Sequence, residues 1–277
     1  MNPQPMPPAQ QHHTWLPIML LALVIPFILT LFYFNLATAA FQQLGLSSGG
    51  ALLVLLGSLV GSMINIPITR RKIVLTDPRA SMMPDVMRMV LPIVHYYPPA
   101  TQEEVIAINV GGALVPISFS IYLIHTLLGL PNASTALLDV LVATVVVIVI
   151  TKLLARPVAG LGITLPGFVA PIIAALTAFL TVHFFGGGIG ALAPVAYIAG
   201  ALGTLVGADL LNLPQVLQGG LLNAGPQRLW GVGPNGELRA PPAILSIGGA
   251  GVFDGIFLSA VIAPLLASFV PASLVAH

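Results

Sequence analysis

Long apolar stretches, nearly free of charge, follow one another along this chain and leave few folds open to it. Only 6% of the residues are charged and 57% are hydrophobic, whereas an average soluble domain has about 25% charged residues. Because about 20 apolar residues suffice for a helix to cross a bilayer, we predict an all-α protein, a polytopic membrane bundle of about seven transmembrane helices, several broken by Gly or Pro. The predicted spans are residues 15–41, 49–68, 105–130, 137–154, 161–184, 189–211 and 243–270, forming one transmembrane domain (15–277) after a disordered tail (1–14).

The basic residues gather on one side of this predicted topology. All nine Lys and Arg residues lie at or in the loops that follow the second, fourth and sixth spans. Because loops rich in Lys and Arg stay in the cytoplasm, we expect a cytoplasmic N-terminus, an outer C-terminus and a location in the plasma (inner) membrane. In the loop after the sixth span, the turn residues Asn235-Gly236 between short extended pieces predict a β-hairpin.

Two carboxylates within the apolar spans are the candidate catalytic residues. Asp254 lies in the Gly-rich run SIGGAGVFDGIFLSA of the seventh span, and Asp209 lies in GADLL near the end of the sixth. A charge at the centre of a bilayer costs about 2.5 to 3.5 kcal/mol, so such residues are usually functional. If the two helices pack antiparallel and the acids meet, the pair shares one proton, and one acid activates water while the other polarises a peptide carbonyl. Otherwise Asp209 is a solvated helix-end residue and Asp254 bonds a neighbouring helix.

Other polar residues in the spans give weaker indications. Asn109, in the helix-breaking run NVGGALVP, can hydrogen-bond either carboxylate or bind substrate backbone. Tyr197 either donates to a carboxylate or serves packing. Asp139 starts the fourth span and is expected to face outer water. The histidines lack metal-ligand spacing, cysteine is absent and no basic block suggests nucleic acid, so we predict no metal, no cofactor and no nucleic-acid partner.

The run GGAGVFDGIFLSA resembles the region around the second catalytic aspartate of presenilin and signal-peptide-peptidase-type intramembrane aspartyl proteases. In this resemblance Gly249 and Gly251 stand for the two motif glycines, Asp254 for the second aspartate and Asp209 for the first. Two residues separate Gly251 from Asp254, where the family motif has none. The resemblance implies cleavage of a transmembrane helical substrate, with a substrate-pairing strand in the loop between the two helices.

Over nearly its full length the chain resembles a second family. The runs INIP, NVGGALVP, GADLL and SIGGAGVFDGIF are similar to an uncharacterised bacterial and archaeal membrane family, catalogued as domain of unknown function 1614. This family implies no activity, so three functional classes stay open. They are an intramembrane aspartyl protease, a proton- or cation-coupled transporter with broken helices and buried acids, and a non-catalytic membrane subunit or assembly factor that binds a partner membrane protein.

Overall fold

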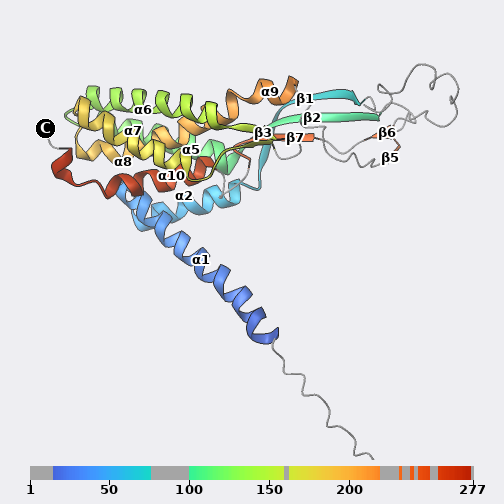
Figure 1. Ribbon diagram of the computed structural model, residues 1–277, viewed down its shortest axis with the longest axis horizontal. Coiled ribbons are helices and arrows are strands. Elements are labelled where there is room, and N and C mark those ends of the chain that lie inside the picture. The colour runs from blue at the N-terminus through green and yellow to red at the C-terminus, as the bar shows by residue number, and fades with distance from the viewer. Residues whose placement is uncertain are drawn as a thin grey trace, which may run out of the picture.

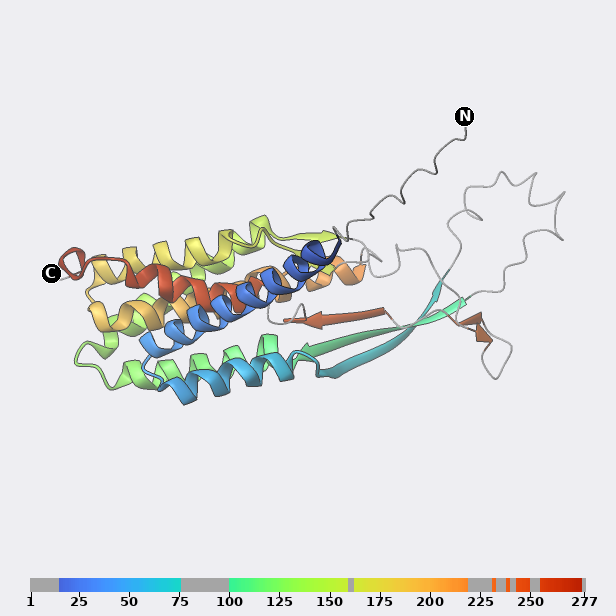
Figure 2. The same ribbon diagram turned by 90° about the horizontal axis from the view of Figure 1, so that it is seen from below.

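The computed structural model describes residues 15–75, 100–158, 162–218, 231–232, 238–239, 243–249 and 255–275. In this part of the chain, apolar helices form a bundle, and a β-sheet extends from one end of it (Figure 1). Figure 2 shows that α10 ends at the opposite end of the bundle. The helices of the bundle are α1 (Trp15–Gln43), α2 (Ser48–Gly61), α5 (Val115–Leu128), α6 (Ala133–Leu154), α7 (Val169–Phe185), α8 (Ile189–Thr204) and α10 (Gly255–Ser268).

Helix α8 is the centre of the bundle. It packs against α5, α6, α7 and α10, and every residue from 194 to 201 is buried. The small residues along α8 explain this position, because they let neighbouring backbones approach closely. A Cβ added at Gly203, for example, would lie 2.6 Å from Cγ1 of Val147 on α6.

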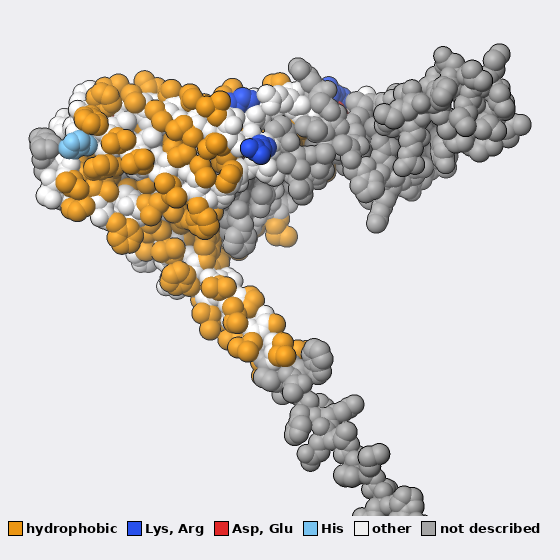
Figure 3. Space-filling model, viewed as in Figure 1, with side chains coloured by type: hydrophobic (Ala, Val, Ile, Leu, Met, Phe, Trp, Pro, Cys, Tyr) orange, Lys and Arg blue, Asp and Glu red, His pale blue; other side chains and the backbone are white. Residues whose placement is uncertain are grey.

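The surface of the bundle is suited to lipid. Four helical segments of the described chain are long and apolar enough to cross a membrane, and three further apolar helices are shorter. Apolar side chains cover the visible face of the bundle (Figure 3), and α1, which tilts away from the other helices in Figure 1, exposes most of its first half. The predicted class, a polytopic membrane helix bundle, is confirmed.

The sheet is built around strand β2. It pairs antiparallel with β1 on one side and parallel with β7 on the other, while β6 pairs with both β2 and β5. The antiparallel β5–β6 pair confirms the hairpin predicted around Asn235-Gly236. A separate small hairpin, β3–β4, follows α6. The strands are β1 (Asn65–Leu75), β2 (Ala100–Asn109), β3 (Arg156–Val158), β4 (Gly162–Thr164), β5 (Gly231–Val232), β6 (Leu238–Arg239) and β7 (Ala243–Ile247).

The strands correct the bounds of four predicted spans, each of which was predicted to be helical over its whole length. The second span ends in β1, the third begins in β2, the fifth begins in β4 and the seventh begins in β7. The protein is therefore mostly α-helical with a small sheet rather than purely α-helical. The predictions were wrong here because short apolar, β-branched runs have the same hydropathy in a buried strand as in a membrane helix.

Candidate functional site

Two π-helical turns mark the place where the bundle meets the sheet. The first, η1 (Val110–Leu114), connects β2 to α5, and the second, η2 (Leu205–Leu210), continues α8 and contains Asp209. Such turns are rare and are often found at functional sites. We use the name junction for η1, η2 and the turn Gly248–Gly249 that follows β7. A small apolar cluster holds the junction together, formed by Ala113, Leu205, Ile247 and Ile256.

Asp209 is fixed at the junction by a backbone hydrogen bond. The N–H of Gly248 donates to Oδ2 of Asp209 at 2.8 Å, and the side chain is partly buried. Gly248 has a φ of +70°, a conformation that favours glycine. A Cβ on Gly249 would overlap Ser246. The two glycines thus form a tight turn that presents a backbone donor to the carboxylate.

Close contact between two backbones positions this turn. A Cβ on Gly112 would overlap the carbonyl oxygen of Gly248, and one on Gly248 would lie 2.6 Å from the carbonyl carbon of Gly112. Gly111 packs in the same way on the end of α2, where the hydroxyl of Ser58 donates to its carbonyl at 2.8 Å. The NVGG run therefore lies between α2 and the turn that holds Asp209.

Asn109 organises this region from a fully buried position. Its Oδ1 accepts from the N–H of Gly112 at 2.8 Å, which caps η1. Its Nδ2 donates to the carbonyl of Ser62 at 2.7 Å and to Oδ1 of Asn65 at 3.0 Å. The hydroxyl of Ser246 donates to the same oxygen of Asn65. Asn109 thus supports Asp209 through Gly112 and Gly248, whereas the predicted roles were a hydrogen bond to either carboxylate or to substrate backbone.

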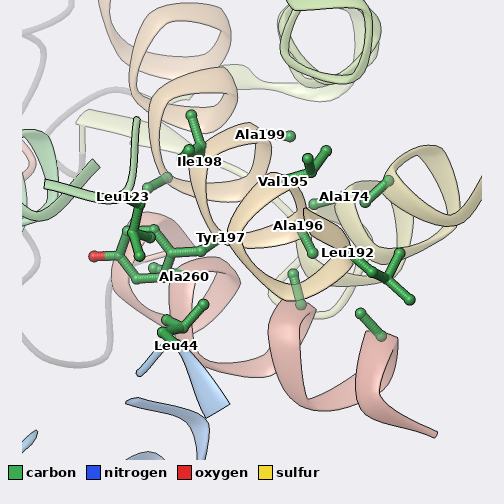
Figure 4. Close-up of a cluster of buried hydrophobic side chains, with 14 of the residues drawn as sticks. Leu44, Leu123, Ala174, Leu192, Val195, Ala196, Tyr197, Ile198, Ala199 and Ala260 are labelled. Atoms are coloured by element: carbon green, nitrogen blue, oxygen red, sulfur yellow. The ribbon is translucent and has the colours of Figure 1, made fainter. Parts of the chain in front are cut away.

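Tyr197 lies in the hydrophobic core of the bundle, close to Leu123 and Ala260 (Figure 4). Its ring meets that of Phe119 edge-on at 5.0 Å and lies 6.0 Å from that of Phe41. It precedes Asp209 by 12 residues on the same helical column, which is about 18 Å at 1.5 Å per residue. The structure therefore supports the packing interpretation of Tyr197 over a hydrogen bond to a carboxylate.

Asp254 and Gly251 lie outside the described residues. Helix α10 begins at Gly255, directly after Asp254 in the sequence. The predicted span that contains Asp254 begins with strand β7 rather than with helix. Ile256, two residues after Asp254, packs in the junction cluster with Leu205.

Asp139 corrects another expectation, because it does not face water. Its side chain is fully buried between α6 and the turn before α8, and a Cβ on Gly187 would overlap its carboxylate. Apart from the backbone of Gly187, no group in the described part of the chain hydrogen-bonds this carboxylate. Among those same residues, no group of three or more His, Cys, Asp or Glu side chains could hold a metal ion.

The fold and the junction define a polytopic membrane protein whose helix bundle carries a small sheet at one end. Residues 59–266 match the family model described as "Protein of unknown function (DUF1614)", and the chain belongs to this family. The match includes both candidate aspartates. No curated protein and no solved structure matches the chain. The resemblance of the sixth and seventh spans to presenilin-type proteases therefore receives no support from these comparisons.

Sequence reasoning missed the supporting residues Asn65, Ser246 and Gly248 as parts of one site. Asn65 and Ser246 come together because β1 and β7 flank β2, with Asn65 opposite Asn109 and Ser246 opposite Ala107. The available signal was the β-branched character of residues 65–75, which is typical of a strand. Reading that run as a strand would have indicated a sheet next to the candidate aspartates.

Proposed function

We propose that this protein is an intramembrane aspartyl hydrolase that cleaves peptide bonds of membrane-embedded helical substrates, with Asp209 and Asp254 as the catalytic pair. The observation that carries the proposal is the hydrogen bond from Gly248 to Asp209. It ties the carboxylate of η2 to the segment that leads into α10. Asp254 stands in that same segment, six residues after Gly248.

The reach of the chain supports a meeting of the two acids. Ile256 and Leu205 belong to one cluster of packed side chains. Asp254 is two residues before Ile256, and two residues of chain span at most about 7 Å. Asp209 is four residues after Leu205, which is about one turn of helix. The length of chain between each acid and its neighbour in this apolar cluster therefore permits the two acids to meet.

The chemistry requires only water and the two carboxyl groups. The ionised carboxylate takes a proton from water, whose oxygen adds to the carbonyl carbon of the peptide, while the protonated acid gives its proton to the carbonyl oxygen. Collapse of the tetrahedral intermediate breaks the C–N bond: the nitrogen leaves with the proton of the pair, and one hydroxyl of the intermediate returns its proton to the pair. The products are a carboxylic acid and an amine, and the pair again holds one proton.

Strand β7 supports a way to present the substrate. One edge of β7 pairs with β2, and among the described residues no strand pairs with its other edge. β7 ends at Ile247, directly before the glycine that binds Asp209. An unwound substrate segment can add to this edge as an extra strand, and its backbone would then lead toward the acids.

The distribution of basic residues supports an orientation in the membrane. Basic side chains are visible where the bundle meets the sheet (Figure 3). Because Lys and Arg are enriched on the cytoplasmic side, we infer that the sheet and the N-terminus are cytoplasmic, that the C-terminus is outside, and that the protein lies in the plasma membrane. The described basic residues at this end are Arg70, Arg71, Lys72, Lys152, Arg156 and Arg239.

Cleavage by the purified protein in liposomes tests the hydrolase proposal. Single-span helical reporter substrates with labels at both ends would be reconstituted with the wild type, Asp209→Asn, Asp254→Asn or Asp139→Asn. We expect each change at the pair to slow cleavage by about 10² to 10⁴-fold, whereas the remote Asp139→Asn variant stays active. Cleavage that survives Asp254→Asn would contradict the proposal.

A second candidate function, proton- or cation-coupled transport, is favoured by Asp139. Its buried carboxylate, which no side chain of the described residues hydrogen-bonds, lies in α6 near the end of the bundle opposite the sheet. Buried acids of this kind often mark ion pathways. Under this alternative, a pH gradient across liposomes drives uptake that Asp139→Asn abolishes, and no reporter is cut. The transport function would be excluded if Asp209→Asn and Asp254→Asn both lose cleavage while Asp139→Asn cleaves the reporter normally.

A further inference from the structure

Two classes of hydroxyl group can be distinguished in the helices of this bundle. Many helical Ser and Thr side chains donate to a carbonyl three or four residues earlier, as is usual in apolar helices. Examples are Thr38, Thr126, Thr151, Thr177, Thr181 and Ser268. Four others have a buried oxygen without a hydrogen-bond partner among the described residues, and each comes from a different helix. These are Ser120 on α5, Thr144 on α6, Thr204 on α8 and Ser259 on α10.

Two of these hydroxyls come from α8 and α10, which pack against each other. The Oγ of Ser259 lies 2.7 Å from the position that a Cβ on Gly200 would occupy. Thr204 is four residues after Gly200, and side chains at this spacing stand on one face of a helix, about 5 to 6 Å apart. Thr204 and Ser259 are 2% and 0% exposed. Both hydroxyls are thus excluded from lipid and separated by about one helical turn.

We propose that Thr204 and Ser259 form an internal water-binding site in the membrane bundle. A hydroxyl that makes no hydrogen bond in an apolar interior costs about 1 to 3 kcal/mol, and a buried water satisfies such groups when it has two to four polar partners. One water with two hydrogen bonds of about 2.8 Å bridges a gap of this size. Gly200 has no side chain, so the hydroxyl of Ser259 packs directly against its backbone on α8.

The position of this site suggests what the water does. Thr204 precedes Asp209 by five residues, and Ser259 follows Asp254 by five, so the site lies about one to two helical turns inside the bundle from the junction. It therefore stores the water that a hydrolase at bilayer depth consumes. This role rests on the proposed function, whereas the binding of water does not.

Water contact can be measured without any activity assay. In solid-state NMR on the full chain in liposomes, magnetisation transfer from water would be followed at labelled Thr residues. We expect transfer to Thr204 to be several-fold faster than to Thr177 and Thr181, which are equally buried but bonded to carbonyls of α7. Ser259→Ala removes one ligand of the water, so it should slow transfer to Thr204 to the rate of these control residues.

Two results would overturn this inference. The first is a wild-type protein in which magnetisation passes from water to Thr204 as slowly as it passes to Thr177. The second is fast transfer to Thr204 that Ser259→Ala leaves unchanged, because the water would then come from the junction itself. If Ser259→Ala does not fold, Thr204→Val read at labelled Ser259 gives the same comparison. The two proposals have separate readouts: the hydrolase proposal depends on the loss of cleavage in Asp254→Asn, whereas the water site depends on the transfer of magnetisation to Thr204.

Discussion

At the scale of single residues, the candidate site depends on backbone contacts that only glycine permits. Gly112 and Gly248 touch through their main chains, and this contact sets the N–H that binds Asp209. A side chain at either position has to displace one of the two backbones. The carboxylate of Asp209 therefore depends on residues nearly 100 and about 40 positions away in the chain.

Gly112→Ala tests this dependence directly. The new Cβ would overlap the carbonyl oxygen of Gly248, and overpacking of this kind costs about 1 to 3 kcal/mol. We expect a lower Tm in detergent and a loss of cleavage by the liposome assay. Gly57→Ala in α2 is the matched control, because a Cβ there meets nothing within 4 Å. An unchanged Tm and activity in Gly112→Ala would contradict the assigned contact.

Asn109 should be far more sensitive than an asparagine at the surface of the bundle. Removal of its amide leaves the N–H of Gly112 and the carbonyl of Ser62 without their partner, and each buried unsatisfied group costs about 1 to 3 kcal/mol. We expect Asn109→Ala to lower the free energy of unfolding accordingly. Asn35→Ala serves as control, because that exposed amide bonds only Leu31 of its own helix. Equal Tm values for the two variants would contradict the role of Asn109.

The sequence alone indicated Asp209 and Asn109 as candidates, because a carboxylate or an amide in an apolar span stands out. Their partners could not be predicted in the same way. Ser62, Asn65 and Gly248 lie about 40 or more residues from the side chains they contact. Such contacts follow only once the pairing of the strands is known, and no local pattern specifies that pairing.

At the scale of elements, an ion pair joins β1 to β2, and its arginine also contacts a short helix. Arg71 of β1 pairs with Glu104 of β2, and its guanidinium also donates to the carbonyl of Leu217 in α9 (Leu213–Gln218). Glu104 is 3% exposed, whereas Arg71 is half exposed. The sequence predicted these residues to be a loop, because charges and prolines after an apolar run resemble a solvated connection. The alternation along a strand was hidden by the register shift between Pro67 and Thr69.

Arg71→Met should weaken the attachment of the sheet, because it leaves the buried Glu104 without the guanidinium. We expect a loss of about 1 to 3 kcal/mol, reduced by the solvent exposure of the arginine. The double variant Arg71→Met/Glu104→Met should regain most of that stability. Arg70→Met, an exposed neighbour on β1, is the control. The measurement is thermal unfolding in detergent, and a double variant no more stable than Arg71→Met would argue against this pair.

At the scale of the whole molecule, hydropathy was sufficient to predict a polytopic bundle. It could not set where helices begin, since strands β2 and β7 continue into the apolar runs that become η1 and α10. The distribution of charge predicts one further global property, the orientation, and the sequence contains no cysteine. Single cysteines can therefore report sidedness without a background.

Glu103→Cys and Ser134→Cys test the orientation, because both positions are exposed and lie at opposite ends of the molecule. Glu103 is in β2 of the sheet, and Ser134 is in the first turn of α6. With the sheet in the cytoplasm, a membrane-impermeant maleimide added to intact cells should label only Ser134→Cys. After permeabilisation both variants should react. The opposite labelling pattern would reverse the assigned orientation.

The central claim is that Asp209 and Asp254 come together at the junction. Disulfide formation in the otherwise cysteine-free chain measures this directly, because a bridge requires Cα atoms about 4.4 to 6.8 Å apart. We predict that Asp209→Cys/Asp254→Cys cross-links under mild oxidation, as does the positive control Arg71→Cys/Glu104→Cys, whose residues are directly paired. Ser134→Cys/Asp254→Cys should not. Absence of the 209–254 bridge, with a bridged positive control, would contradict the account.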